Sequence, residues 1–474
     1  MSKVKQQGNA FLGTDNVRSI MMRFAVPAII SLVVNALYNV VDQIFIGWGI
    51  GEMGMAATNI TFPLNTIATS LSLLFAIGGA ANFNLNMGKG DENRASVCVG
   101  NSVTGVLVSG VLVGTMVLAF MEPLLYAFGG TPDMMEYALP YTLITAMGLP
   151  FMMMSTTFGH LARADGNPKF SMAVMLSGAI FNLIFDPVFL FVFDMGIEGI
   201  ALATTLGQVL SAAVGGFYML RRFSSIKLRA SHLKPDFAVI RRIAAVGMAS
   251  CFNQLAMTVV QIAQNNTLKH YGGLSVYGSE IPQAAIGAIS KITIILFSVV
   301  LGFAQGASPI ISFNYGAKKF ARVREAYLTA LTGATVVSVV SFLIYQIFPR
   351  QIMMIFGTTE PLFMDFAVRY LKTFMFMAFI NGIHAVTSNF FTSIGKAQMG
   401  FWISLTRQIL LLLPLMLILP AMLGIDGFFF AGPIADACAA TLTGAFAFRE
   451  LRKVKALEML HPLTPEGEVV EAEA

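Results

Sequence analysis

Residues 182–187 read Asn-Leu-Ile-Phe-Asp-Pro and interrupt an apolar run, 170–193, in which Asp186 is the one ionisable side chain. A carboxyl group at membrane depth is energetically expensive and marks a functional site by default. Pro187 has no N–H, so one carbonyl of the preceding turn loses its helical partner, and a hinge is predicted there. Asn182 lies four residues before Asp186, on the same helix face. The structural alternative is a simple break in a buried helix.

The composition places this stretch in a polytopic membrane protein. Hydrophobic residues make up 56% of the 474 residues and charged residues only 12%, about half the charged share of a typical soluble domain. The three cysteines lie in separate apolar segments, so no disulfide framework or metal site is predicted. Because neither a phosphate-binding loop nor paired histidines with metal spacing occur, we expect no enzyme and no cofactor. Transport would then be driven by an ion gradient.

Twelve apolar segments are long enough to span a bilayer, at about 20 residues each. We expect no signal peptide before the first of them, because residues 1–17 contain no apolar core. The predicted helices cover 18–47, 56–85, 95–120, 136–160, 170–193, 197–220, 240–266, 283–313, 325–348, 364–392, 398–423 and 427–449.

The basic residues predict the orientation of these helices. Of the 30 Lys and Arg residues, 24 lie near the two termini or in the even-numbered loops, whereas the odd-numbered loops contain only Lys269 and Arg350. By the positive-inside rule, both termini are cytoplasmic. The basic residues are spread over short loops, so nucleic-acid binding is not expected.

The two halves of the chain repeat with an offset of 228 residues. Six helices per half with one orientation make a parallel repeat, and transporters of this kind bind substrate between the repeats. The predicted architecture is all-α, with two pseudo-symmetric six-helix lobes. The matching positions are Gly78, Asn86, Gly88 and Arg94 with Gly306, Asn314, Gly316 and Arg322; one inserted residue later, Tyr141 matches Tyr370. The predicted regions are a cytoplasmic N-terminal segment (1–17), an N-lobe (18–220), a linker (221–242), a C-lobe (243–450) and a disordered tail (451–474).

The repeat fails at the acidic residues. Asp186 aligns with Leu415, and Asp42 in the first helix has no acidic counterpart. Counted along their helices at about 1.5 Å per residue, Asp42 and Asp186 reach similar depths in the outer half of the bilayer. We expect them to share one chamber that takes up and releases protons. Asn35 and Asn39 precede Asp42 on the same face of helix one.

Further polar residues in the second half are candidates for the substrate cavity or for contacts between helices. Helix seven has a polar stripe of Gln254, Thr258, Gln261 and Asn265, and helix ten has one of Asn381, His384 and Ser388. Lys291, Arg407 and Asp436 are intramembrane charges that the sequence does not pair. Methionines 152–154 suit an adaptable apolar pocket or a lipid-facing surface.

These motifs resemble the multidrug and toxic compound extrusion (MATE) family. The resemblance covers about residues 15–450 and rests on Asn182, Asp186 and Pro187, on helix one around Pro27 and Asp42-Gln43, and on the run Gly302 to Pro309 followed by Asn314-Tyr315-Gly316-Ala317. The chain is most similar to the prokaryotic DinF/MepA-like branch, in which acids of helices one and five are implicated in cation coupling. A sodium-coupled branch of the family resembles this chain less, because its members carry carboxylates in helices seven and ten. Here helix seven has the amides Gln254, Gln261 and Asn265, and helix ten has Asp365 only at its outer end.

The resemblance and the residues together predict a monomeric, multi-pass exporter in the inner membrane of a prokaryote, which exchanges lipophilic or cationic drugs or toxic metabolites for external protons. The alternatives are sodium coupling through the same acids and a flippase for a lipid-linked substrate. A membrane enzyme and a receptor are disfavoured. The predicted site residues are Asp42, Asp186, Asn182 and Asn39 for cation coupling, Pro27 and Pro187 as hinges, and Asn35, Tyr38, Gln254, Thr258, Gln261, Asn265, Met154 and Asn381 for the substrate cavity.

Overall fold

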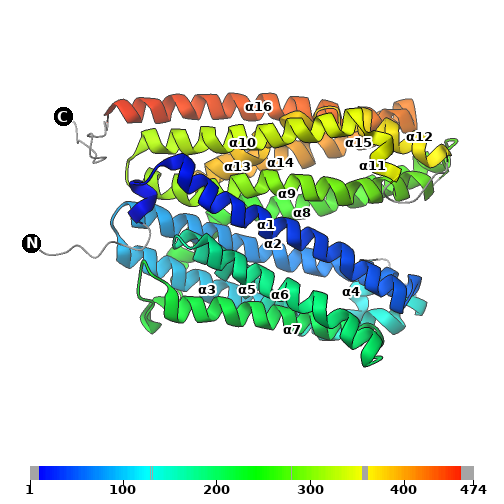
Figure 1. Ribbon diagram of the computed structural model, residues 1–474, viewed down its shortest axis with the longest axis horizontal. Helices are drawn as coiled ribbons and strands as arrows, with labels where there is room; N and C mark the ends of the chain where they lie inside the picture. The colour runs from blue at the N-terminus through cyan, green and yellow to red at the C-terminus, as the bar shows by residue number, and fades with distance from the viewer. Residues whose placement is uncertain (1–9, 129, 131, 279, 355–360, 461–474) are drawn as a thin grey trace, which may run out of the picture.

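The computed structural model describes residues 10–128, 130, 132–278, 280–354 and 361–460, which form a bundle of long helices (Figure 1). Within these residues, eleven helices are long and apolar enough to cross a membrane, and a bent helix pair supplies a twelfth span. The predicted all-α fold with twelve spans is confirmed.

The N-lobe contains the first six spans. A short 3-10 helix, η1 (Ala10–Gly13), precedes them, and a short helix, α4 (Met121–Ala127), follows the third span. The spans are α1 (Val17–Gly49), α2 (Glu52–Gly88), α3 (Glu92–Ala119), α5 (Pro132–Ala164), α6 (Pro168–Pro187) continued by η2 (Val188–Val192), and α7 (Gly196–Phe217) continued by η3 (Tyr218–Arg222).

The C-lobe contains the second six spans. The linker before it forms one 3-10 turn, η4 (Ala230–Leu233), and a short helix, α11 (Pro349–Met354), follows the ninth span. The spans are α8 (Phe237–Gly273), α9 (Glu280–Gly316), α10 (Phe320–Ile347), the bent span of α12 (Pro361–Arg369), η5 (Tyr370–Phe374), η6 (Ala378–Ile380) and α13 (Asn381–Ser393), the span of α14 (Ala397–Leu405), η7 (Thr406–Leu412) and α15 (Leu413–Leu423), and α16 (Ile425–Leu460).

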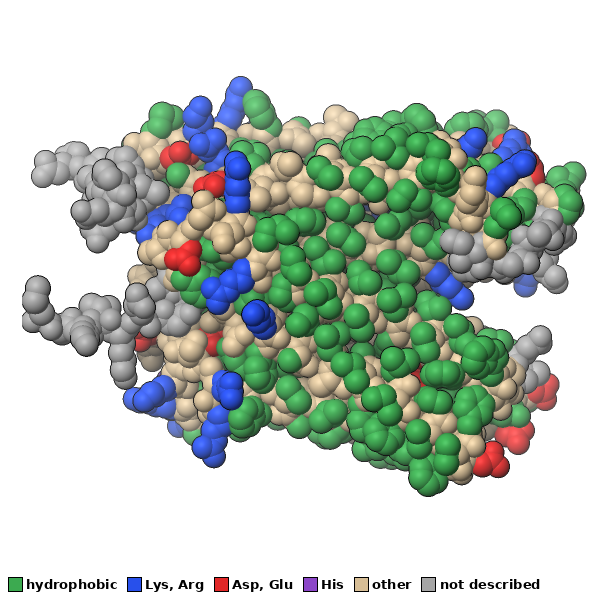
Figure 2. All heavy atoms as spheres, viewed as in Figure 1, with side chains coloured by type: hydrophobic (Ala, Val, Ile, Leu, Met, Phe, Trp, Pro, Cys, Tyr) green, Lys and Arg blue, Asp and Glu red, His purple; other side chains and the backbone are tan. Residues whose placement is uncertain are grey.

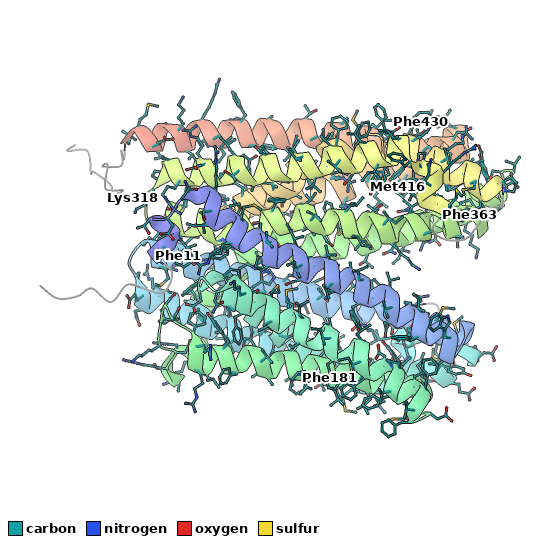
Figure 3. The ribbon with its side chains drawn as sticks, in the orientation of Figure 1. Phe11, Phe181, Lys318, Phe363, Met416 and Phe430 are labelled. Atoms are coloured by element: carbon teal, nitrogen blue, oxygen red, sulfur yellow. The ribbon has the colours of Figure 1, made fainter. Side chains whose placement is uncertain are left out.

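The two lobes meet at the end of the molecule where the chain begins and ends, and separate toward the opposite end. At the closed end one hydrophobic core joins residues of both lobes, among them Phe83 and Phe158 with Ile310 and Phe390. At the opposite end each lobe has its own core, and Figure 2 shows a notch between the lobes there. Figure 3 places Phe363 and Met416 in the separate core of the C-lobe.

Glycines at equivalent positions of the repeat make the closed end. A Cβ atom on Gly78 of α2 would overlap the carbonyl oxygen of Ile243 in α8, and one on Gly306 of α9 would lie 2.8 Å from the Cα atom of Ala25 in α1. The first two helices of each lobe thus cross the first two helices of the other lobe at backbone contact. The repeat read from the sequence places these two glycines in register.

The chain before each lobe docks on the opposite lobe. The segment before α1, which we call the N-terminal arm (residues 10–16), is held by the C-lobe: Asn314 and Arg322 donate to the carbonyl of Leu12 at 2.8 and 3.0 Å. Phe11 of the arm also stacks under the guanidinium of Arg23, 4.7 Å from its ring centre (Figure 3).

The linker before α8 docks on the N-lobe in a similar way. The Nδ2 atom of Asn101 in α3 donates to the carbonyl of His232, and the backbone N–H of Asp236 donates to the Oδ1 atom of Asn101. Loop residue Asp165 accepts from the Tyr218 hydroxyl and from the backbone N–H groups of Ser224 and Ser225 at 2.7 to 2.8 Å. These contacts hold the linker along the closed end.

The last helix is longer than predicted. Residues 451–460 were expected to begin a disordered tail, but they continue α16. Val454 in this extension is fully buried, and Glu458 pairs with Arg324 of α10 at 3.1 Å. These contacts with the C-lobe stabilise a helical segment that the composition alone predicts to be disordered. The rest of the predicted tail, 461–474, lies outside the described residues.

Candidate cation-coupling site

Asp42 of α1 and Asp186 of α6 lie close together inside the N-lobe, near enough for their carboxyl groups to interact. The two helices pack directly against each other. The side chain of Asp186 is 1% exposed and that of Asn182, one turn earlier, is 2% exposed. The structure therefore brings three of the four residues predicted for cation coupling into one region of the N-lobe.

Three oxygen atoms of this cluster have no hydrogen-bond partner among the described residues. They are the Oδ1 atoms of Asp42, Asn182 and Asp186, and all three are buried. Buried polar atoms in proteins are nearly always paired, and an unpaired one costs about 1–3 kcal/mol. Acceptors left open in this way suit a site that takes up a proton or a small cation.

Hydroxyl groups from neighbouring helices surround the acids. The Nδ2 atom of Asn182 donates to the Thr204 hydroxyl of α7 at 2.9 Å, which aims its free oxygen away from α7. Tyr38 lies close to Thr204, and Tyr38 and Tyr141 both lie close to the two carboxyl groups. Sequence reasoning placed Tyr38 in the substrate cavity and missed Thr204 and Tyr141. The match between Tyr141 and Tyr370 in the repeat was the signal available for Tyr141.

Asn39 is turned away from this cluster. Its Nδ2 atom donates to the carbonyl and side-chain oxygens of Asn35 one turn earlier, at 2.7 and 3.1 Å. Both asparagines are exposed. The polar stripe predicted on helix one therefore divides into exposed asparagines and an inward-facing aspartate.

The two predicted hinges differ in local structure. Pro27 lies inside the unbroken helix α1, and the Ser31 hydroxyl donates to its carbonyl at 2.8 Å. Pro187 ends the regular part of α6, and the chain continues through the wider turn of η2, in which the N–H of Phe193 bonds to the carbonyl of Val188. The widened turn follows from the missing N–H of proline.

The C-lobe carries an ion pair between its fifth and sixth spans. The Nε atom of Arg407, in η7, lies 2.6 Å from the Oδ1 atom of Asp436 in α16, and this carboxyl group is buried. Tyr370, the repeat counterpart of Tyr141, lies close to this pair. Lys291, the third charge that the sequence left unpaired, is exposed.

The residues predicted for the substrate cavity are spread over several environments. Gln261 and Asn265 of α8 are exposed, whereas Gln254 and Thr258 are partly buried. Met154 packs against the hydrophobic cores of the closed end and of the N-lobe, and Asn381 is partly buried at the start of α13. The other two members of the helix-ten stripe contact C-lobe neighbours: Ser388 bonds to Ser404 at 2.6 Å and His384 to Thr443 at 3.4 Å.

Comparison with known proteins decides the family. The MatE family profile matches residues 27–188 and 249–418, one block in each lobe. The chain belongs to the MatE family. The resemblance inferred from the motifs around Asp186 and Gly302 is confirmed, and both halves of the repeat carry the family pattern.

Curated MatE-type relatives include two staphylococcal proteins named multidrug export protein MepA. The protein from Staphylococcus saprophyticus is 24% identical over 443 residues, which cover 93% of this chain and 96% of that protein. The protein from Staphylococcus aureus strain N315 is 23% identical, over 89% of this chain and 91% of that protein. Both agree with the branch inferred from the sequence.

Solved MATE structures share the fold. A multidrug resistance MATE family transporter in an outward-facing conformation superimposes with a TM-score of 0.88, covering 96% of this chain and all of the other at 20% identity. A MOP superfamily transporter from Pyrococcus furiosus superimposes with a TM-score of 0.87 at the same identity. Like these neighbours, this MatE protein is a multi-pass membrane protein.

In the part of the C-lobe that the structure describes, no carboxylate pair resembles that of the N-lobe. Helix α8 contains no acidic residue, and Asp365 of α12 accepts from the Tyr277 hydroxyl at 2.6 Å near the outer end of the bundle. Asp436 is committed to Arg407. Among the described residues, open carboxyl oxygens therefore gather in the N-lobe.

Proposed function

We propose that the protein is a multidrug efflux transporter that exchanges lipophilic or cationic compounds from the cytoplasm for external protons. The observation that carries this proposal is the pair of facing carboxyl groups of Asp42 and Asp186 with open, buried oxygens. Two ionised carboxylates at this separation repel each other strongly away from water. A proton held between them turns the repulsion into a hydrogen bond, so the site is suited to loading and unloading protons.

The distribution of charge supports the orientation that this exchange needs. Figure 2 shows Lys and Arg side chains on both lobes at the end of the molecule that contains the termini, and a second group at the opposite end of the C-lobe. Of the 30 Lys and Arg residues, 24 belong to segments that the sequence assigns to the first of these ends. The positive-inside rule makes that end cytoplasmic and the notch extracellular. The protein is then closed to the cytoplasm and open outward, in the state in which the carboxyl groups take up protons and the compound leaves.

The helices beside the notch supply polar groups for a bound compound. Asn35 and Asn39 of α1 and Gln261 and Asn265 of α8 are exposed, and α1 and α8 are the first helices of the two lobes. Exposed amides are unfavourable against lipid and favourable in a water-filled cavity.

The proposed exchange cycle follows from these features. Once protonated, the chamber loses its attraction for a cation. The lobes then part on the cytoplasmic side, and the protons leave inward.

Sodium is the second candidate for the coupling ion. The open oxygens of Asp42 and Asp186 are joined by the open amide oxygen of Asn182, and three oxygens are a suitable start for the coordination shell of a hard cation. In this case the same chamber works with Na⁺ in place of H⁺.

The deciding experiment is export of ethidium from reconstituted vesicles under a proton gradient or a sodium gradient alone. We expect the proton gradient to drive export, and Asp42→Asn and Asp186→Asn each to abolish it, because an amide cannot exchange a proton. The matched control is Asp133→Asn, an exposed carboxylate at the outer end of α5.

Export driven by sodium alone would reassign the chamber to Na⁺. Failure of both gradients to move the dye would overturn multidrug export, and lipid-linked substrates of a flippase would then be tested in the same vesicles. Loss of export in Asp133→Asn would show that the effect is not specific to the chamber.

A further inference from the structure

A small pocket lies between the lobes at the closed end, away from the acids. It is lined by α2 and α5 of the N-lobe and by α9 and α13 of the C-lobe, with Arg163, His160, Gln305, Ser308 and Asn389 among its residues. Its volume is about 20 Å³, slightly more than the 10–15 Å³ that one water molecule needs.

Arg163 gives this pocket an uncompensated positive charge. Its side chain is 3% exposed. Its guanidinium donates to the side-chain oxygens of Gln305 and Ser171, and no carboxylate among the described residues forms an ion pair with it. Buried charges in proteins are usually paired, because an unpaired buried charge costs several kcal/mol. The carboxyl end of α5 compensates part of this charge through the helix dipole.

Arg163 and Asn389 both present hydrogen-bond donors at the pocket. Arginine has five N–H donors, and two of those of Arg163 have a described partner. No described residue accepts from the Nδ2 atom of Asn389, whose Oδ1 atom already accepts from Ser393. The single Ser393 hydroxyl proton is shared between Asn389 and Ser308, whose hydroxyl oxygen lies 2.8 Å away.

We propose that this pocket binds one small monovalent anion, such as chloride or the carboxylate end of a small molecule, on Arg163 and Asn389. The donors and the buried positive charge select an anion, and the volume excludes phosphate, sulfate and any whole drug molecule. Since Arg163 belongs to the N-lobe and Asn389 to the C-lobe, the site exists only while the lobes are closed at this end. A bound anion therefore stabilises this arrangement of the lobes.

The test measures the melting temperature of the purified full-length protein while chloride replaces gluconate at constant ionic strength. We expect a saturable rise, since a ligand that binds only the folded state stabilises it by mass action. Arg163→Gln and Asn389→Leu should each raise the half-maximal chloride concentration by about tenfold, the equivalent of one lost contact of about 1.4 kcal/mol. Lys169→Gln, which removes an exposed charge near the same end, is the matched control and should bind chloride as the wild type does.

Formate replaces chloride in a parallel series to separate the two sources of the anion. A response to chloride identifies a free inorganic ion, and a response to formate alone identifies a carboxylate end. If Arg163→Gln does not fold, Asn389→Leu gives the same readout from the other lobe. The absence of a saturable response to either anion, or an unchanged response in the folded variants, would overturn the proposal. Neither result depends on transport, so it leaves the proposed export function standing.

Discussion

At the scale of single residues, the lobes differ in how their buried charges are balanced. In the N-lobe, Tyr141 lies beside two carboxyl groups with open oxygens, whereas in the C-lobe its counterpart Tyr370 lies beside Arg407 and Asp436, which neutralise each other. The two tyrosines at matching positions of the repeat therefore lie beside open carboxyl oxygens in one lobe and beside a neutralised ion pair in the other. Charge exchange is accordingly proposed for the N-lobe, and a structural role follows for the ion pair of the C-lobe.

This structural role can be tested with a double-mutant cycle. Arg407→Met leaves the carboxylate of Asp436 buried and unpaired, which should destabilise the protein by about 3–5 kcal/mol. The double variant Arg407→Met/Asp436→Leu removes both charges and should recover most of this loss. The measurement is thermal unfolding in detergent. A double variant as unstable as the single one would show that the pair does more than neutralise itself.

The residues of the candidate site were unequally visible in the sequence. An isolated carboxyl group in an apolar run stands out, so Asp42 and Asp186 could be predicted. Thr204 could not, because hydroxyl residues are common in membrane helices and their role depends on how α7 is rotated against α6. The partner of Asp436 was hidden for the same reason, since two basic residues were available to it and only the packed structure selects Arg407.

At the scale of elements, close helix crossings decide where the lobes touch. Gly306 of α9 lies against the backbone of Ala25 in α1, and Gly78 of α2 lies against the backbone of α8. Backbone atoms cannot move aside as a flexible side chain can. The glycines therefore fix the distance between the lobes at the closed end.

Two glycines of the same helix provide a matched test of this idea. In Gly306→Ala the added methyl group would lie 2.8 Å from the Cα atom of Ala25, and forcing the helices apart should destabilise the protein by about 1–3 kcal/mol. Gly287→Ala places its methyl group in open space and should stabilise α9 by up to about 1 kcal/mol. The melting temperature should fall in Gly306→Ala and rise in Gly287→Ala. Equal effects would show that the crossing tolerates a larger residue.

Element positions were largely predictable and their internal geometry was not. Hydrophobic length alone located all twelve spans, because a bilayer demands a run of about 20 apolar residues. The bend of 45° in the tenth span and the wide turn at Arg407 depend on packing against neighbours. The segment before Asn381 has no proline within one turn, so no proline marked the bend. The wide turn was marked by Pro414, two residues after η7, whose missing N–H leaves the Leu410 carbonyl without its helical partner.

At the scale of the whole molecule, the two lobes are fastened together by segments that lie outside the membrane spans. The N-terminal arm precedes the N-lobe but is held by Asn314 and Arg322 of the C-lobe. The linker precedes the C-lobe but is held by Asn101 of the N-lobe. In the proposed exchange cycle, each of these contacts between the lobes loosens when this end opens.

Variants of Arg322 and of its repeat counterpart Arg94 can test whether the contact with the N-terminal arm matters, or only the positive charge. Arg322→Gln removes a charged donor to the arm, worth about 1.5–3 kcal/mol, and should shift the population toward cytoplasmic opening by tenfold or more. Arg94 is two-thirds exposed and pairs with Asp91 within its own helix turn, so Arg94→Gln should have no effect. Electron–electron distance measurements between spin labels at Lys169 and Arg449, with the native cysteines replaced, report the opening. Unchanged distances in Arg322→Gln would contradict the fastening role of the arm.

The confinement of both open carboxyl groups to one lobe sets a limit on the energetics of the proposed exchange. Asp42 and Asp186 together can carry at most two protons per turnover, so exporting a singly charged cation moves one net charge inward. One charge crossing 100 mV supplies about 2.3 kcal/mol, equivalent to an accumulation ratio of roughly 50-fold. A doubly charged compound would be exchanged without net charge movement, and its accumulation would follow the pH difference alone.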